Sequence, residues 1–108
     1  GLGDVYKRQP LNEVSLEGII EEKKLRETPL GRKICDVKLK TLRENGKEDL
    51  ITCIAWGKGA EYTDSLALGD RVSTYGRLQS RRYKKTCKDG CVVEKVTYEL
   101  SIKGIVGV

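Results

Sequence analysis

Apolar and polar side chains alternate along five separate stretches of this chain, and a period of two residues is the pattern of half-buried β-strands. The first stretch covers residues 12–27 and places on one face Val14, Leu16, Gly18 and Ile20. Residues 28–31 (TPLG) predict a turn, because Pro presets φ at the second position and Gly suits the fourth. In the second stretch one face of the strand carries Cys35, Val37, Leu39 and Thr41. The opposite face carries Asp36, Lys38, Lys40 and Leu42.

A hairpin is predicted at Asn45-Gly46, because both residues tolerate a positive φ in a type I′ turn. The third stretch places Ile51, Cys53 and Ala55 on one face and, on the other, Leu50, Thr52, Ile54 and Trp56. Because both faces carry apolar groups, one of them needs a partner other than the core.

Residues 60–68 predict a short helix that plugs the barrel and ends at Gly69 in a left-handed conformation. The fourth strand is expected to point inward with Val72, Thr74, Gly76 and Leu78 and outward with Tyr75, Arg77, Gln79, Arg81 and Tyr83. After a turn at Asp89-Gly90, the fifth has its inward set at Val96, Tyr98, Leu100 and Ile102. This order predicts an all-β fold, the five-stranded Greek-key barrel of the oligonucleotide-binding (OB) type with a helix between strands three and four.

With 108 residues the chain is long enough for one domain. Residues 1–9 show no useful period and look like a non-native or disordered leader, so the predicted domain is residues 10–108. The chain contains no Met, and a fragment, a processed product or an engineered version would each explain that. No apolar run approaches the length of a membrane span or a secretory signal, which predicts a soluble, cytoplasmic protein.

The net charge of +5 is unevenly distributed. Residues 71–88 contain seven basic and no acidic residues, whereas residues 12–27 contain five Glu against three basic residues. A localised basic strip is expected of a protein that binds a polyanion, because neutralised phosphates release condensed counterions. The alternative is that these charges only keep a small protein soluble.

Four cysteines and no histidine favour a reducing compartment over a disulfide framework. Cys35 and Cys53 lie within strand patterns and read as core residues, while Cys87 and Cys91 face each other across a hairpin tip. A zinc site is the weaker interpretation, because no His can complete it. The sequence therefore predicts no metal and no cofactor.

Five short motifs resemble the bacterial single-stranded DNA-binding protein (SSB) family in order and spacing. They are residues 12–18 (NEVSLEG), 28–31 (TPLG), 55–61 (AWGKGAE), 68–72 (LGDRV) and 76–83 (GRLQSRRY). The chain is most similar to forms from low-GC, spore-forming bacteria, in which a domain like residues 12–103 can follow a related one. The resemblance implies a nucleoid-associated protein and a homodimer, a homotetramer or part of a tandem OB-fold chain.

The family's mode of binding implies base stacking on Trp56 and Tyr83, while two further stacking positions are occupied here by Asn45 and Leu50. The family's acidic C-terminal tip has no counterpart after Glu99. From the alternation alone, Trp56 faces away from the core, although a rim position against the helix is the alternative. Tyr83 lies between basic residues, as in an unspecific strand-binding groove, or is incidental on a solvated hairpin. The full predicted DNA-binding set is Trp56, Tyr83, Arg77, Arg81, Lys38, Lys40, Gln79, Arg82, Lys84 and Lys85.

Tyr75 shares the outward face of the fourth strand and could serve a subunit contact, while Tyr62 and Tyr98 are assigned to the helix plug and the core. Nothing in the chain predicts an enzyme, since there is no His and no phosphate-cradling Gly loop. The expected function is sequence-independent single-stranded DNA binding in replication, recombination or repair. RNA binding stays open, because stacking and phosphate contacts do not sense the 2′-OH. The alternative is a protein-interaction module of a replication-restart assembly with weak nucleic-acid affinity.

Overall fold

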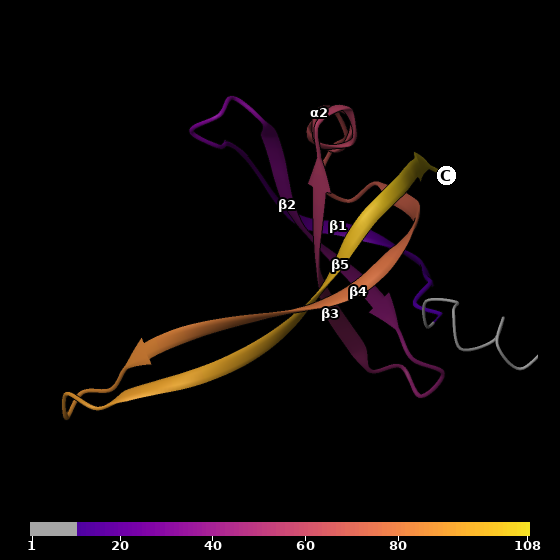
Figure 1. The fold of residues 1–108 in the computed structure, drawn as a ribbon. Helices are drawn as coiled ribbons and strands as arrows, with labels where there is room; N and C mark the ends of the chain where they lie inside the picture. Colours follow the sequence, from indigo (N-terminus) through magenta and orange to yellow (C-terminus); the bar gives the residue numbers. More distant parts are fainter. Residues whose placement is uncertain (1–10) are drawn as a thin grey trace, which may run out of the picture.

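The computed structural model describes residues 11–108 and shows five strands and one helix (Figure 1). The strands are β1 (Val14–Glu27), β2 (Lys33–Leu42), β3 (Glu48–Trp56), β4 (Arg71–Thr86) and β5 (Val92–Gly107), and helix α2 (Lys58–Ser65) lies between β3 and β4. They form a closed barrel in the order β1-β2-β3-β5-β4. The predicted all-β OB fold is confirmed, while the predicted leader, residues 1–9, lies outside the described residues.

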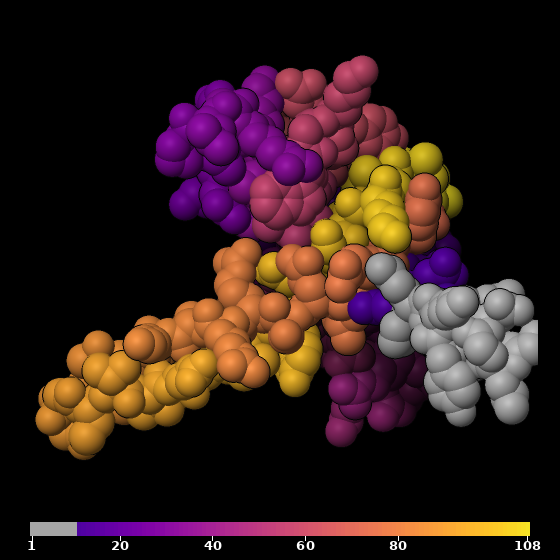
Figure 2. All heavy atoms as spheres, in the orientation of Figure 1, coloured from indigo at the N-terminus to yellow at the C-terminus, as the bar shows by residue number. Residues whose placement is uncertain are grey.

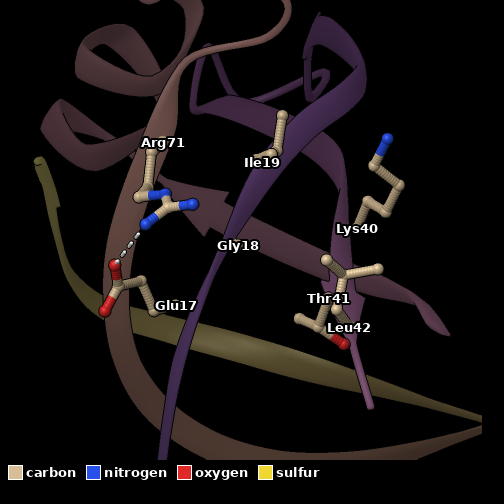
Figure 3. Close-up of a pocket in the computed structure, with 7 residues that line it drawn as sticks. All are labelled: Glu17, Gly18, Ile19, Lys40, Thr41, Leu42 and Arg71. Atoms are coloured by element: carbon tan, nitrogen blue, oxygen red, sulfur yellow. Dashed lines mark ion pairs between the residues drawn. The ribbon is translucent and has the colours of Figure 1, made fainter. Parts of the chain in front are cut away.

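Strand β1 closes the barrel because it pairs with β4 through its first half and with β2 through its second. A register shift between Ile20 and Glu22 marks where β1 bends from one partner to the other. Gly18 sits just before this bend, and a Cβ there would lie 2.8 Å from the carbonyl oxygen of Lys40. Figure 3 shows the residues that line a pocket around Gly18, with the Glu17–Arg71 ion pair (3.7 Å) bridging β1 to β4.

The barrel interior holds the apolar sets that alternation predicted on β1, β2 and β3, completed by residues of β4 and β5. The buried cluster is Ile20, Cys35, Val37, Leu39, Cys53, Ala55, Ala60, Val72, Leu100 and Ile102. The second apolar face of β3 is partly covered by the chain itself. Ile54 is only 1% exposed, with Asp36 of β2 and Ser101 of β5 as its cross-strand neighbours.

Helix α2 plugs one end of the barrel, as predicted, with Ala60 and Thr63 fully buried. Its predicted bounds, residues 60–68, were wrong, since the helix starts at Lys58 and ends at Ser65. The Lys23 ammonium of β1 donates to the carbonyls of Asp64 and Leu66 and so satisfies the end of the helix. Gly69 does have a positive φ of 90°, but in the following turn, where the Asp70 amide donates to the Ala67 carbonyl.

The three hairpins share one turn type. In each, the amide of a positive-φ glycine donates to the carbonyl three residues earlier, at Gly31, Gly46 and Gly90. The predicted type I′ turn was wrong, because Asn45 does not have a positive φ. Instead the Asn45 side chain accepts a hydrogen bond from the Lys47 amide (3.0 Å), and the glycine alone takes the left-handed position of a bulged loop.

Strands β4 and β5 continue far beyond the barrel as a two-stranded arm, defined here as residues 80–98 (Figures 1 and 2). The prediction that Leu78, Val96 and Tyr98 point into the core was wrong, because they are 46%, 50% and 64% exposed. Alternation assigned them to the inward face correctly. However, β4 pairs with no strand other than β5 beyond Gly76, so that face meets solvent.

Candidate nucleic-acid interface

One face of the β4–β5 ladder gathers much of the predicted DNA-binding set. Successive residues of a strand point to opposite faces, so the β4 side chains on this outer face are Arg77, Gln79, Arg81, Tyr83 and Lys85. Opposite them on β5 lie Ser101, Glu99, Thr97, Lys95 and Val93. Tyr83 is 44% exposed, and its neighbours on the same face of β4 are Arg81 and Lys85. The arm as a whole contains six basic and two acidic residues, so it is positive.

A buried carboxylate holds two of these side chains in place. Glu99 is only 5% exposed, and its Oε1 accepts hydrogen bonds from Gln79 Nε2 (2.7 Å) and from an Arg81 guanidinium nitrogen (3.2 Å). A buried charge is tolerated only when it is paired and hydrogen-bonded, so Glu99 fixes the position of both partners. The Arg81 side chain remains half exposed and keeps further donors for a ligand. Sequence reasoning missed Glu99, although its outward parity between Tyr98 and Leu100 could have indicated it.

Trp56 lies at the end of β3, half-buried and outside the core cluster. The guanidinium of Arg32 lies 4.7 Å from the centre of its ring, which is a cation–π contact. An open pocket beside Trp56 is lined also by Lys58, Tyr62 and Lys103. Tyr62 belongs to the plug as predicted, since its hydroxyl accepts a hydrogen bond from the Gly107 amide (3.0 Å), yet it is 41% exposed.

Lys103 connects the Trp56 region to β4. It lines the pocket beside Trp56 and also a second pocket formed with Tyr75 and β1. Tyr75 covers Gly104 closely, because a Cβ at Gly104 would lie 2.1 Å from the Tyr75 ring. Sequence reasoning did not select Lys103, although the inward position of Ile102 placed its neighbour outward. Lys103 thus lies beside both Trp56 and Tyr75, and Tyr75 precedes the β4 row on the same strand.

The two β2 lysines both lie next to carboxylates of β1. Lys40 forms an ion pair with Glu21 (2.9 Å), and this hydrogen bond raises the pKa of Lys40 above its ordinary value. Lys38 lies 3.5 Å from Glu22. Leu50, cross-strand from Lys40, is 53% exposed. This end of the barrel therefore presents cations whose charge is locally compensated.

Arg82 and Lys84 point to the opposite face of the arm from Arg81 and Tyr83. They share that face with Val96 and Tyr98, and Arg82 lies 3.9 Å from Glu94. The structure therefore does not bring the basic residues of the arm together into one strip. It divides them between two faces.

No group of three or more potential metal ligands occurs within residues 11–108. Among the residues that the structure describes, no helix is long and apolar enough to cross a membrane.

An OB barrel with exposed aromatic and basic side chains along its outer strands is typical of single-stranded nucleic-acid-binding proteins. The model of the Single-strand binding protein family matches residues 11–105, and the chain belongs to this family. It is therefore a single-stranded DNA-binding protein of a replication-related class whose members bind rather than catalyse and typically form oligomers.

Among solved structures, the protein priB from Ralstonia solanacearum has a similar fold, with a TM-score of 0.66 and 22% identity. The match covers 92% of this chain and 100% of that one. None of the curated proteins matches.

Proposed function

We propose that this chain binds single-stranded DNA without sequence preference, by stacking bases on Trp56 and Tyr83 while Arg77, Arg81 and neighbouring cations contact phosphates. Two observations support this proposal most strongly: the pockets that Lys103 lines with Trp56 and with Tyr75, and the row of β4 side chains from Arg77 to Lys85 on one face of the ladder. Alternating aromatic and basic side chains suit any base sequence, because every base has a stacking face and every nucleotide a phosphate. Such binding serves replication, recombination or repair.

The fixed geometry around Glu99 supports the role of Arg81 and Gln79. A side chain already held in one orientation loses less conformational entropy when a ligand binds. Glu99 itself would repel phosphate, but two donors share its charge. We propose that Gln79 and Arg81 present their remaining donors to the strand, whereas Lys38, Lys40, Arg82 and Lys84 contribute general attraction more than direct contact.

Replacing Trp56 by alanine is expected to weaken oligo-dT binding by about 1–3 kcal/mol, the value of one base–aromatic stack. Trp56 is the chain's only Trp, so its fluorescence should be strongly quenched when oligo-dT is titrated into the parent protein. A Trp56→Phe variant keeps a stacking ring and is expected to retain most of the affinity. Unchanged emission at saturating DNA would place Trp56 outside the binding surface.

A base that stacks on Trp56 either shares the ring with the Arg32 guanidinium or displaces that guanidinium from the ring. Arg32→Ala leaves the ring in place and separates the two cases. Tighter binding indicates that the base displaces Arg32, and weaker binding indicates that Arg32 contacts the strand alongside the base.

Binding is expected to weaken linearly in log K against log salt, with a slope of about −0.7 per phosphate neutralised on a single strand. Duplex DNA of the same length should bind far less tightly, because paired bases hide the faces that Trp56 and Tyr83 require. Fluorescence anisotropy with labelled dT and duplex oligonucleotides at several salt concentrations measures both effects. Equal affinities for the two ligands would rule out stacking.

One observation favours a second candidate function, that of a protein-interaction module. The inner face of the β4–β5 ladder exposes Leu78, Val92, Val96 and Tyr98, interspersed with Arg82, Lys84 and Glu94, and no element among the described residues covers them. Exposed apolar groups of this kind occur at protein contacts. A chain that acts only as a protein-interaction module would still bind DNA through its charges, and this binding would depend on salt. Oligo-dT would not quench its Trp56 fluorescence.

A further inference from the structure

Two cysteines occupy directly opposite positions at the tip of the arm. The ladder ends at the pair Thr86 and Val92, and immediately beyond it the Cys87 amide donates to the Cys91 carbonyl (2.7 Å). The Cα atoms of such hydrogen-bonded pairs lie about 5.5 Å apart, inside the range of about 4.4–6.8 Å that a disulfide spans. Opposite residues also project from the same face of a ladder. The two cysteines therefore lie close enough for a disulfide after a small local adjustment, because the Cβ atoms of opposite residues lie about 4.5–5.5 Å apart and a disulfide brings them to about 3.5–4.5 Å.

The turn that joins the two cysteines is well defined. The Gly90 amide donates to the Cys87 carbonyl (3.0 Å), and the Asp89 side chain accepts a hydrogen bond from the Cys91 amide (3.1 Å). Gly90 takes the positive φ that closes the loop. These contacts hold the cysteines in register in the reduced state, in which all four cysteines of the chain are free.

The other two cysteines are protected by their position. Cys35 and Cys53 are 0% exposed in the barrel core. Burial raises the pKa of the Cys53 thiol to about 12 and raises that of Cys35 as well, which keeps both in the unreactive thiol form. Cys91 is exposed and Cys87 partly exposed at the end of the arm farthest from the barrel (Figure 1). Only the tip pair is accessible to a reagent in solution.

The charge around the tip favours an anionic reagent. Lys84, Lys85 and Lys88 lie within a few residues of Cys87, and Asp89 and Glu94 only partly offset them. A cationic surface raises the local concentration of small anions. A glutathione-type disulfide carries carboxylates and therefore meets the tip at an increased rate in low salt.

We propose that Cys87 and Cys91 form a thiol–disulfide exchange site that reacts with low-molecular-weight disulfides. The thiolate of one cysteine attacks a sulfur of the small disulfide, which forms a mixed disulfide and expels one small thiolate. The second cysteine then attacks the protein-side sulfur of that mixed bond and expels the second small thiol. The two cysteines lose two electrons and two protons in total, and the small disulfide is reduced to two thiols.

The bond would tie β4 to β5 two residues beyond Lys85 and four beyond Tyr83. A two-stranded arm without a third strand is only marginally stable by itself, so the tie reduces its freedom. Resting on the proposed function, oxidation is expected to tighten single-stranded DNA binding by about three- to tenfold, because less ordering remains for the ligand to impose.

The test incubates the reduced full chain with oxidised glutathione, blocks free thiols with N-ethylmaleimide after unfolding, and measures the intact mass. The expected product is a monomer with maleimide on Cys35 and Cys53 only and an internal bond between Cys87 and Cys91. The matched variants Cys87→Ser and Cys91→Ser should stop at the mixed disulfide with glutathione. A parent chain that stops at the mixed disulfide, forms disulfide-linked dimers or remains fully reduced would overturn the proposal.

A second readout separates the thiol site from the DNA site. Oligo-dT affinity is compared between the oxidised and reduced parent and the Cys87→Ser/Cys91→Ser double variant given the same treatment. A gain confined to the oxidised parent supports the proposed coupling, and equal affinity of the oxidised and reduced parent overturns it. If the internal bond forms and neither state binds DNA, the proposed function fails while the thiol site stands.

Discussion

Replacing Arg77, Tyr83 and Lys85 together by alanine is expected to weaken oligo-dT binding at least about a hundredfold, roughly 3 kcal/mol. The variant loses one base stack worth about 1–3 kcal/mol and two phosphate contacts. All three side chains lie on the outer face of the β4–β5 ladder. Arg81 is left in place because without it the buried Glu99 carboxylate would lose an ion-pair partner, which would destabilise the fold. The salt slope should become shallower by about 0.7 for each cation removed.

The opposite face of the same arm offers a matched control. Arg82→Ala, Lys84→Ala and Tyr98→Ala together remove the same number of cations and one tyrosine from the inner face. If binding depends on the outer face, this variant should lose no more than about fivefold, through its weaker general attraction for the strand. Anisotropy titrations at one salt concentration compare the two directly. Equal losses in both variants would show that only the net charge of the arm matters.

Gly76→Ala is expected to destabilise the fold by about 3 kcal/mol, the upper end of the usual cost of overpacking. A Cβ at Gly76 would lie 2.0 Å from the Ser101 carbonyl oxygen and 3.1 Å from the Ile102 Cα. These are backbone atoms, and β4 cannot retreat from them, since Gly76 is also paired with Val14 of β1. For a domain of this size the melting temperature should fall by about 10–20 °C.

Gly59→Ala serves as the control for that measurement. Gly59 lies in α2 with open space around the position of its Cβ, and alanine favours a helix over glycine by up to about 1 kcal/mol. Thermal unfolding followed by circular dichroism should therefore show a small gain for Gly59→Ala against a large loss for Gly76→Ala. If the Gly76→Ala protein melts at the same temperature as the parent, β4 and β5 can move apart to accept the added Cβ without a loss of stability.

The strands could be predicted from sequence because each has a buried and a solvated face within the barrel. Val37 and Leu39 of β2 alternate with lysines, and the structure buries the former and leaves the latter partly exposed. The turn glycines were equally visible, since Gly31 and Gly90 both take the positive φ that their positions require. The OB topology followed from the order of these elements together with the helix between β3 and β4.

Alternation could not reveal how much of each strand the barrel covers. Val96 and Tyr98 continue the inward pattern of Leu100, yet they are exposed because the strands that could cover them pair only with the barrel part of β4 and β5. The helix bounds failed for a related reason, since Lys23 from β1 satisfies carbonyls at the helix end that sequence alone leaves open.

The sequence by itself determined which residues have a face to bury, which turns can form and which side chains can stack or carry charge, because these depend on residue type and local spacing. Only the tertiary structure determined which of these residues lie next to one another. Lys103 lies beside Trp56 in one pocket and beside Tyr75 in another, and Glu99 binds Gln79 and Arg81, because barrel closure places β3, β4 and β5 side by side. The physical reason is that cross-strand register and the extent of the arm depend on contacts between residues far apart in the chain, which a local pattern does not encode.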